Sequence, residues 1–87
     1  MFGLEGIRPN PSRGTVTCRV NLQGPEGASL ELLDVAGRVW VRRPVGSLGP
    51  GTHDVIVQAP AAMGSGVFFV RLERAGEMRV SRVTILR

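Results

Sequence analysis

Residues that could carry out chemistry are few in this sequence, and they lie far apart. There is one histidine, His53, one cysteine, Cys18, and no tyrosine. The carboxylates fall singly along the chain, at Glu5, Glu26, Glu31, Asp34, Asp54, Glu73 and Glu77. Catalytic and metal sites need such groups together, as paired carboxylates, clustered ligands or a nucleophile beside a base. The sequence therefore predicts no catalytic residue, no metal site and no cofactor.

The remaining reactive groups have ordinary structural interpretations. The segment 63–67 holds Ser65 between two glycines, but it has neither the lysine of a nucleotide-binding loop nor the preceding strand of a nucleophile elbow, so we interpret it as a turn. Cys18 lies on the apolar side of an alternating segment, which favours a small core residue over a reactive thiol. His53 has no second ligand or nucleophile to work with, which favours a plain strand-end histidine.

The basic charge predicts no particular partner. The formal charge of +4 comes from eleven arginines and no lysine, and only Arg42 and Arg43 are adjacent. A nucleic-acid-binding surface more often clusters its cations and interleaves aromatic residues, so we expect no nucleic-acid partner. No apolar run approaches the ~20 residues of a transmembrane helix. The first residues lack a basic flank and an apolar run, so an export signal would lie outside this sequence.

The elements that must position these residues are short strands. Twelve glycines and six prolines separate apolar segments that show no helical period. A chain of 87 residues encloses a single core, so residues 1–87 form one all-β domain, a sandwich or a barrel. Residues 1–8 are either an edge strand or a remnant of a linker. We expect strands at 15–22, 52–58 and 67–73, a rigid corner at 8–14, a turn at 24–27, and loops at 44–50 and 59–66.

The hairpin over residues 30–43 organises the prediction. If Asp34 to Gly37 form a four-residue loop, Leu33 pairs with Arg38 and every apolar pair falls on one side. The expected pairs are Leu32 with Val39, Glu31 with Trp40 and Leu30 with Val41. Arg38, Trp40 and Arg42 then share the outer face, where guanidinium stacking on the indole and an ion pair to Glu31 are possible. Trp40 could be a carbohydrate or partner platform, or it could simply stabilise that face.

The last hairpin has the densest apolar run. A tight turn at 74–77 sets Arg74 opposite Glu77 and Phe68 opposite Val83. Phe68, Val70, Leu72, Val83 and Ile85 then face the core, and the outer face carries Val67, Phe69, Met78, Val80 and Leu86. That face is more apolar than a solvated surface needs. Either further protein covers it, from this chain or from a neighbouring domain, or it is a docking surface.

Five stretches of the chain, in order, resemble the type A C-terminal sorting domains of the type IX secretion system, a family related to the immunoglobulin-like domain of flagellar hook-capping proteins. They are Pro9-Asn10-Pro11, residues 30–38, Gly51-Thr52-His53, residues 65–72 and the basic-apolar strand 79–87. The sequence departs from the family pattern at Leu33, at Phe68-Phe69-Val70 and at Arg79 and Arg82, where family members commonly have aromatic residues or lysines.

The resemblance implies a small antiparallel immunoglobulin-like β-sandwich of six to seven strands. It also implies a non-catalytic domain that directs a larger exported protein through the periplasm and across the outer membrane to the cell surface. The secretion machinery, or a neighbouring domain of the same polypeptide, would be the partner. The candidate recognition residues are Pro9, Asn10, Pro11, Asp34, Gly37, Arg38, Gly66, Arg79, Arg82 and Arg87, and the candidate contact face is Trp40, Phe69 and Val80.

Each matched residue also has a structural interpretation. Gly37 and Gly66 would relieve turn or close-packing geometry, and Asp34 would accept local backbone hydrogen bonds. The alternative function is a constitutive immunoglobulin-like module that packs on a neighbouring domain or a filament. Oligomeric state is left open by the sequence.

Overall fold

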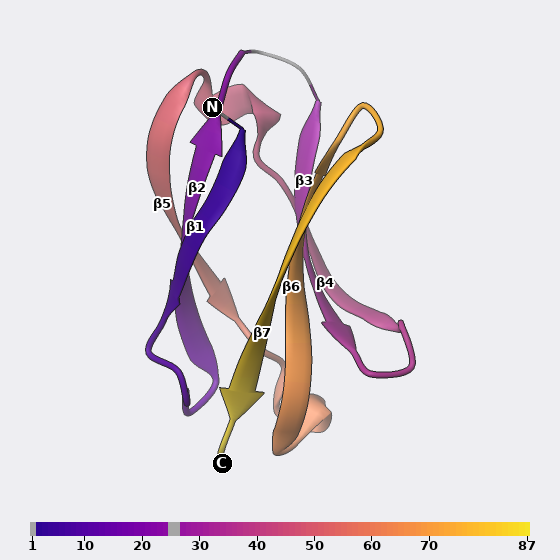
Figure 1. Cartoon of the computed structure of the whole chain (residues 1–87). Coiled ribbons are helices and arrows are strands. Elements are labelled where there is room, and N and C mark those ends of the chain that lie inside the picture. Colours follow the sequence, from indigo (N-terminus) through magenta and orange to yellow (C-terminus); the bar gives the residue numbers. More distant parts are fainter. Residues whose placement is uncertain (1, 25–26) are drawn as a thin grey trace.

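A computed structural model describes residues 2–24 and 27–87 and arranges them as two facing β-sheets (Figure 1). Its elements are β1 (Gly3–Arg8), β2 (Thr15–Leu22), β3 (Ala28–Asp34), β4 (Val39–Pro44), η1 (Gly46–Leu48), β5 (Gly51–Gln58), η2 (Ala61–Met63), β6 (Gly66–Arg74) and β7 (Glu77–Ile85), where η denotes a short 3-10 helix. The predicted turn at 24–27 includes residues 25 and 26, which lie outside the described part of the chain.

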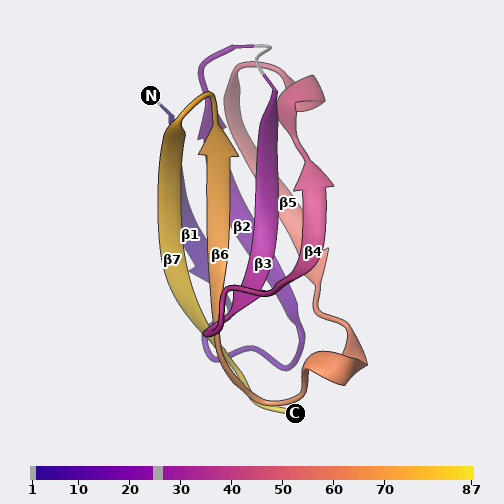
Figure 2. The ribbon, with the colours of Figure 1, turned by 90° about the vertical axis from the view of Figure 1, so that its right-hand side faces the viewer.

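The strand order confirms the predicted sandwich and gives it seven strands. One sheet has the order β1-β2-β5 and the other β4-β3-β6-β7, and all neighbouring strands are antiparallel. Figure 2 looks onto the second sheet, with the first behind it. The second strand pairs with the fifth and the third with the sixth, as in immunoglobulin-like sandwiches, while the fourth strand lies beside the third.

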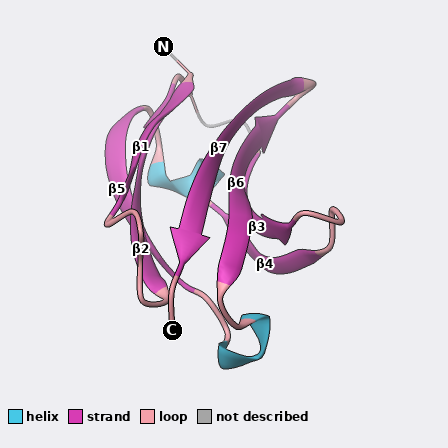
Figure 3. Ribbon diagram, turned by 60° about the horizontal axis from the view of Figure 1, so that its bottom comes forward, coloured by secondary structure: helices cyan, strands magenta, loops and turns pink. Residues whose placement is uncertain are grey.

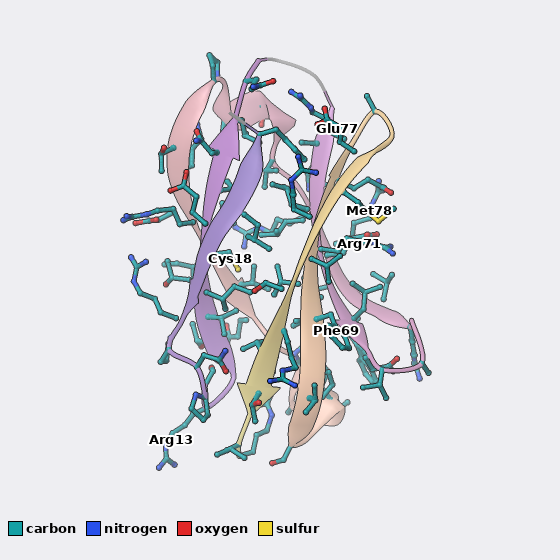
Figure 4. All side chains as sticks on the ribbon, in the orientation of Figure 1. Arg13, Cys18, Phe69, Arg71, Glu77 and Met78 are labelled. Atoms are coloured by element: carbon teal, nitrogen blue, oxygen red, sulfur yellow. The ribbon has the colours of Figure 1, made fainter. Side chains whose placement is uncertain are left out.

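The core lies between the sheets and follows from the alternation of the strands. On β2 the four apolar residues of the alternating face are almost fully buried, and Cys18 among them has no exposed surface. Figure 4 shows its sulfur between the two layers. The inward residues predicted for β3, β6 and β7 are buried as well: Ala28, Leu30, Leu32, Phe68, Val70, Leu72, Val83 and Ile85.

Residues 3–8 form an edge strand, as one of the two predictions for this segment had it. Phe2 is 2% exposed, and Leu4 and Ile7 pack against the core. Their spacing does not fit a regular strand, because Ile7 lies three residues after Leu4. A register shift between Leu4 and Gly6, against β2, accommodates this spacing and returns Ile7 to the inner side.

Each of the two predicted loops contains a short helical turn, and each places one apolar residue in the core. Figure 3 shows them at separate places on the molecule, each between strands of different sheets. Val45, just before η1, is 2% exposed, and its N–H bonds the carbonyl of Ala28 at 2.9 Å. Met63 in η2 is 8% exposed. Both residues belong to the hydrophobic core.

The predicted register of the first hairpin is wrong, because a β-bulge shifts the pairing of its two strands. Leu33 pairs with Val39 instead of Arg38, and Leu32 pairs with Val41. Trp40 is the extra residue, and it packs, partly buried, against the core beside Val41. Val39 consequently leaves the core and is 41% exposed. The three residues Arg38, Trp40 and Arg42 therefore do not form one outer stripe.

The register of the last hairpin is as predicted. Arg74 pairs with Glu77 and Phe68 with Val83, without a shift over the whole ladder. No strand in the described part of the chain covers the outer face of this hairpin. Val67, Met78 and Val80 are 39%, 49% and 57% exposed there.

Candidate interaction surfaces

Asp34 is the centre of the turn between β3 and β4. Its Oδ1 accepts hydrogen bonds from the backbone N–H groups of Ala36 (3.0 Å) and Arg38 (2.9 Å), and its Oδ2 accepts one from the indole of Trp40 (3.1 Å). The Asp34 N–H donates to the Arg38 carbonyl at 3.0 Å. The bond from the Arg38 N–H, followed by that from Trp40, lowers the pKa of Asp34. The predicted structural role of Asp34 is confirmed.

The rest of the turn is held by its own side chains. The Arg38 guanidinium lies over the Trp40 ring, 4.3 Å from its centroid, so the predicted stack exists. Gly37 has φ +85°, a left-handed conformation that favours glycine. The turn is therefore stabilised by its own contacts, and Val35 projects from it with 75% of its surface exposed.

A second group, which includes the predicted residues Asn10 and Arg82, meets at the end of β7, although 72 to 74 positions of sequence separate the bonded partners. The side chain of Asn10 accepts from the N–H of Thr84 (3.0 Å) and donates to the carbonyl of Arg82 (3.3 Å). Ser12 continues the contact, because its N–H donates to the Thr84 carbonyl and its carbonyl accepts from Leu86, both at 2.8 Å. We call residues 10–12 the cap. It joins the free edge of β7 to the corner after β1.

Arg87 fastens the same end of the molecule. Its guanidinium donates to the carbonyls of Ala59 and Pro60, both at 2.9 Å, and its N–H donates to the Ser65 hydroxyl at 2.8 Å. A Cβ placed on Gly14 would lie 2.9 Å from an Nη atom of Arg87, so the guanidinium passes close above this glycine. Gly66, at φ +154°, lies next to Ser65, with the Phe68 ring close by. The structure thus groups Arg87 and Gly66 near the cap.

The side chains of Arg79 and Arg82 lie apart from these groups. Arg79 donates to the Met78 carbonyl at 2.9 Å, lies 3.7 Å from the Glu77 carboxylate, and stands 5.4 Å from the centre of the Phe2 ring. The backbone carbonyl of Arg82 contacts the cap, while its guanidinium makes no ion pair with any residue of the described chain. The predicted recognition residues therefore form no single cluster.

The outer face of the β4-β3-β6-β7 sheet combines apolar residues with one charged network. Phe69 and Val80 line a shallow hollow of about 220 Å³, together with Leu33, Asp34, Val35, Gly37 and Arg71. Trp40, predicted to share this face, does not line the hollow. Figure 4 shows Phe69, Arg71 and Met78 on this side of the molecule.

Glu31 holds the charged network together. It is only 8% exposed, and its carboxylate lies 2.7 Å from the Arg71 guanidinium and 3.6 Å from that of Arg42. The ion pair predicted between Glu31 and the outer arginines of the hairpin is therefore present with Arg42. Arg71 therefore belongs both to this network and to the lining of the hollow, whose other residues are mainly apolar.

Cys18 and His53, whose side chains could react, occupy structural positions in the fold. Burial raises the pKa of the Cys18 thiol to about 11. The His53 ring lies 2.9 Å from the Gly49 carbonyl. Within residues 2–24 and 27–87, His, Cys, Asp and Glu form no group of three that could hold a metal ion. No helix of the described segments has the length and apolarity to cross a membrane.

Sequence reasoning missed the role of Ser12. This residue is 1% exposed, and its hydroxyl donates to the Thr15 carbonyl (2.8 Å) and accepts from the Gly14 N–H (2.9 Å). A serine two positions before a glycine, in a turn, is a signal for such a local bond. Its distant partners on β7 leave no trace in the local sequence.

The chain matches no model of a known protein family, and no curated protein matches its sequence.

Proposed function

We propose that this chain is a non-catalytic sorting domain that directs a larger exported protein across the outer membrane to the cell surface. The support comes from the sequence resemblance together with the contact between its first and last motifs. Asn10, the middle of the Pro-Asn-Pro motif, is hydrogen-bonded to the last strand at Arg82 and Thr84. Asn10 therefore ties the first motif to the last strand, which would be the element that the secretion machinery reads.

A reporter fusion tests this proposal. The chain is fused behind an exported fluorescent reporter in a bacterium that possesses the type IX system, and surface delivery is measured by protease accessibility on intact cells. Removing residues 81–87 would also remove the buried residues Val83 and Ile85, so truncation would confuse signal with folding. Surface variants are cleaner. Arg82→Glu is expected to reduce delivery severalfold, because a partner reading the last strand would meet a reversed charge there.

The matched control is Arg19→Glu, which reverses the charge of an exposed arginine on β2, in the other sheet. Delivery of this variant should equal that of the parent. Equal delivery of the reporter with and without the chain would contradict the sorting function outright.

One observation favours a second function, a structural module that stays in the mature protein. The outer face leaves Val80 and Met78 about half exposed beside the hollow, as an interface to a neighbouring domain would. Mass spectrometry of the surface-exposed protein separates the two functions. Peptides from this chain in the mature protein indicate the structural module, and their removal on delivery indicates sorting.

A further inference from the structure

The free edge of β7 is divided into a closed half and an open half. In the regular ladder with β6, Thr84 turns its backbone N–H and carbonyl away from β6, and the cap binds both. Residues two and four positions earlier have the same orientation, because backbone groups alternate along a strand. The Arg82 carbonyl also binds the cap. Beyond that point, toward the start of β7, the cap ends.

The open half runs from Met78 to Arg82. Among the described residues, no hydrogen-bond partner faces the N–H and carbonyl of Val80 or the N–H of Arg82 on this edge, and the Met78 carbonyl binds only the Arg79 guanidinium. The side chains of Met78 and Val80 are 49% and 57% exposed. An edge with free donors and acceptors is a template for another strand.

Two of the other three sheet edges, β1 and β4, lack this openness. β1 is interrupted by its register shift, and β4 has the bulge at Trp40 and ends in Pro44, devices that prevent strand addition. On β5, the Ile56 carbonyl accepts a hydrogen bond from Arg43. β5 and β7 both pair regularly with their inner neighbours, β5 over all eight of its residues and β7 over all nine. Of these two regular edges, β7 is the one on which exposed apolar residues, Met78 and Val80, alternate with arginines.

The side chains of this edge specify the charge of what can bind. Arg79 and Arg82 have opposite parity on the strand, so one guanidinium stands on each face of the sheet. Arg79 keeps 46% of its side chain exposed despite its contact with Glu77, and Arg82 has no ion pair within the described chain. A second copy of this chain would bring like charges together, whereas an acidic segment would neutralise both cations.

We propose that the open half of β7 accepts an extended acidic segment of a partner protein as an eighth strand. The segment would place apolar side chains opposite Met78 and Val80, where the apolar hollow adjoins, and carboxylates opposite Arg79 and Arg82. This inference rests on the proposed function, because it names the kind of segment that the sorting machinery would present. The residues, in antiparallel order, would be Glu-Ser-Val-Glu-Val.

A peptide titration tests the proposal. The isotope-labelled chain is titrated by NMR with the heptapeptide Thr-Glu-Ser-Val-Glu-Val-Thr and with a matched peptide carrying lysine in place of glutamate. The expected result is a set of chemical-shift changes centred on the amides of Met78, Val80 and Arg82. We expect the acidic peptide to bind about tenfold more tightly, since two exposed ion pairs replace two repulsions.

Two variants probe the edge itself. Val80→Pro removes the outward N–H, and proline is tolerated on strand edges, so binding should be lost while the far-UV spectrum is retained. Arg82→Glu keeps the backbone intact and should weaken binding of the acidic peptide about tenfold, whereas the control Arg19→Glu, on the other sheet, should leave its affinity unchanged.

Several results would overturn the inference: no shift changes with the acidic peptide, equal affinity for the lysine peptide, shift changes confined to β4 or β5, or dimerisation of the chain through β7 in sedimentation. Failure of peptide binding counts against this inference alone, whatever the reporter assay gives. If the unaltered chain binds the peptide but does not deliver the reporter to the cell surface, the result counts against the sorting function alone.

Discussion

Replacing Ser12 by alanine is expected to destabilise the fold strongly, although the change removes a single oxygen atom. The hydroxyl accepts a hydrogen bond from the buried N–H of Gly14 and donates one to the Thr15 carbonyl. With alanine, the Gly14 N–H stays buried without a partner, which costs about 1–3 kcal/mol, and the partly exposed carbonyl adds about 0.5–1 kcal/mol. The expected loss is therefore about 1.5–4 kcal/mol of unfolding free energy.

That loss is large for this chain. A domain of this size has a total stability of about 4–13 kcal/mol, and a loss of about 1.5–4 kcal/mol lowers the Tm by roughly 6–32 °C. Urea unfolding followed by Trp40 fluorescence measures the free energy, and an unchanged m-value shows that the compactness of the native state is retained. Hydrogen exchange adds a local readout, because the Leu86 amide, which bonds to the Ser12 carbonyl, should lose protection.

The matched control is Ser47→Ala, at an exposed serine in η1. Its unfolding free energy should stay within about 0.5 kcal/mol of the parent value. If Ser12→Ala behaves like this control, and Leu86 keeps its protection, the hydroxyl does not organise the corner, and the reasoning that places the cap under its control is refuted.

Three further predictions concern the core, the turn and the thiol. Leu72→Ala, at a fully buried position, should cost about 2–5 kcal/mol in chemical denaturation, and a loss below 1 kcal/mol would mean that the core collapses around the gap. The folded-state pKa of Asp34 is lowered, so its carboxylate contributes stability above its unfolded pKa near 3.8 and loses it as the pH falls further. Asp34→Asn should therefore be less stable than the parent at pH 7, with the difference shrinking toward pH 2, and a constant difference would disprove the linkage. Cys18, with its pKa raised to about 11, should react with iodoacetamide at pH 8 only in denaturant, and fast labelling of the native chain would contradict its burial.

The sequence was sufficient wherever one strand face is fully buried. Alternation placed Val16 and its neighbours in the core, and the short turn at Arg74–Glu77 fixed the last hairpin, because a tight turn leaves only one pairing that keeps Phe68 inside. Side-chain period and turn length are both local properties. They determine the register without any knowledge of the other sheet.

The sequence was insufficient where local hydrogen bonds compete with pairing. Asp34 binds two turn N–H groups and the Trp40 indole, and this network draws Trp40 inward and forces the bulge. The alternation of side chains along a strand does not include such bonds, and it therefore predicts Val39 in the core, where the structure leaves Val39 41% exposed. The cap was equally hidden, since Asn10 and Thr84 meet only after both sheets have formed.

The position of the cap gives the sandwich a direction of mechanical strength. β1 begins at the end of the molecule opposite to the one where β7 finishes (Figure 1). Ser12 forms a parallel β-bridge with Ile85. Its N–H and carbonyl are hydrogen-bonded to Thr84 and Leu86, the neighbours of Ile85, each at 2.8 Å. A pulling force applied between the first and last strands would shear both of these bonds at once instead of opening them in turn. A protein tethered through this domain would transmit tension along β7 before the sheets separate.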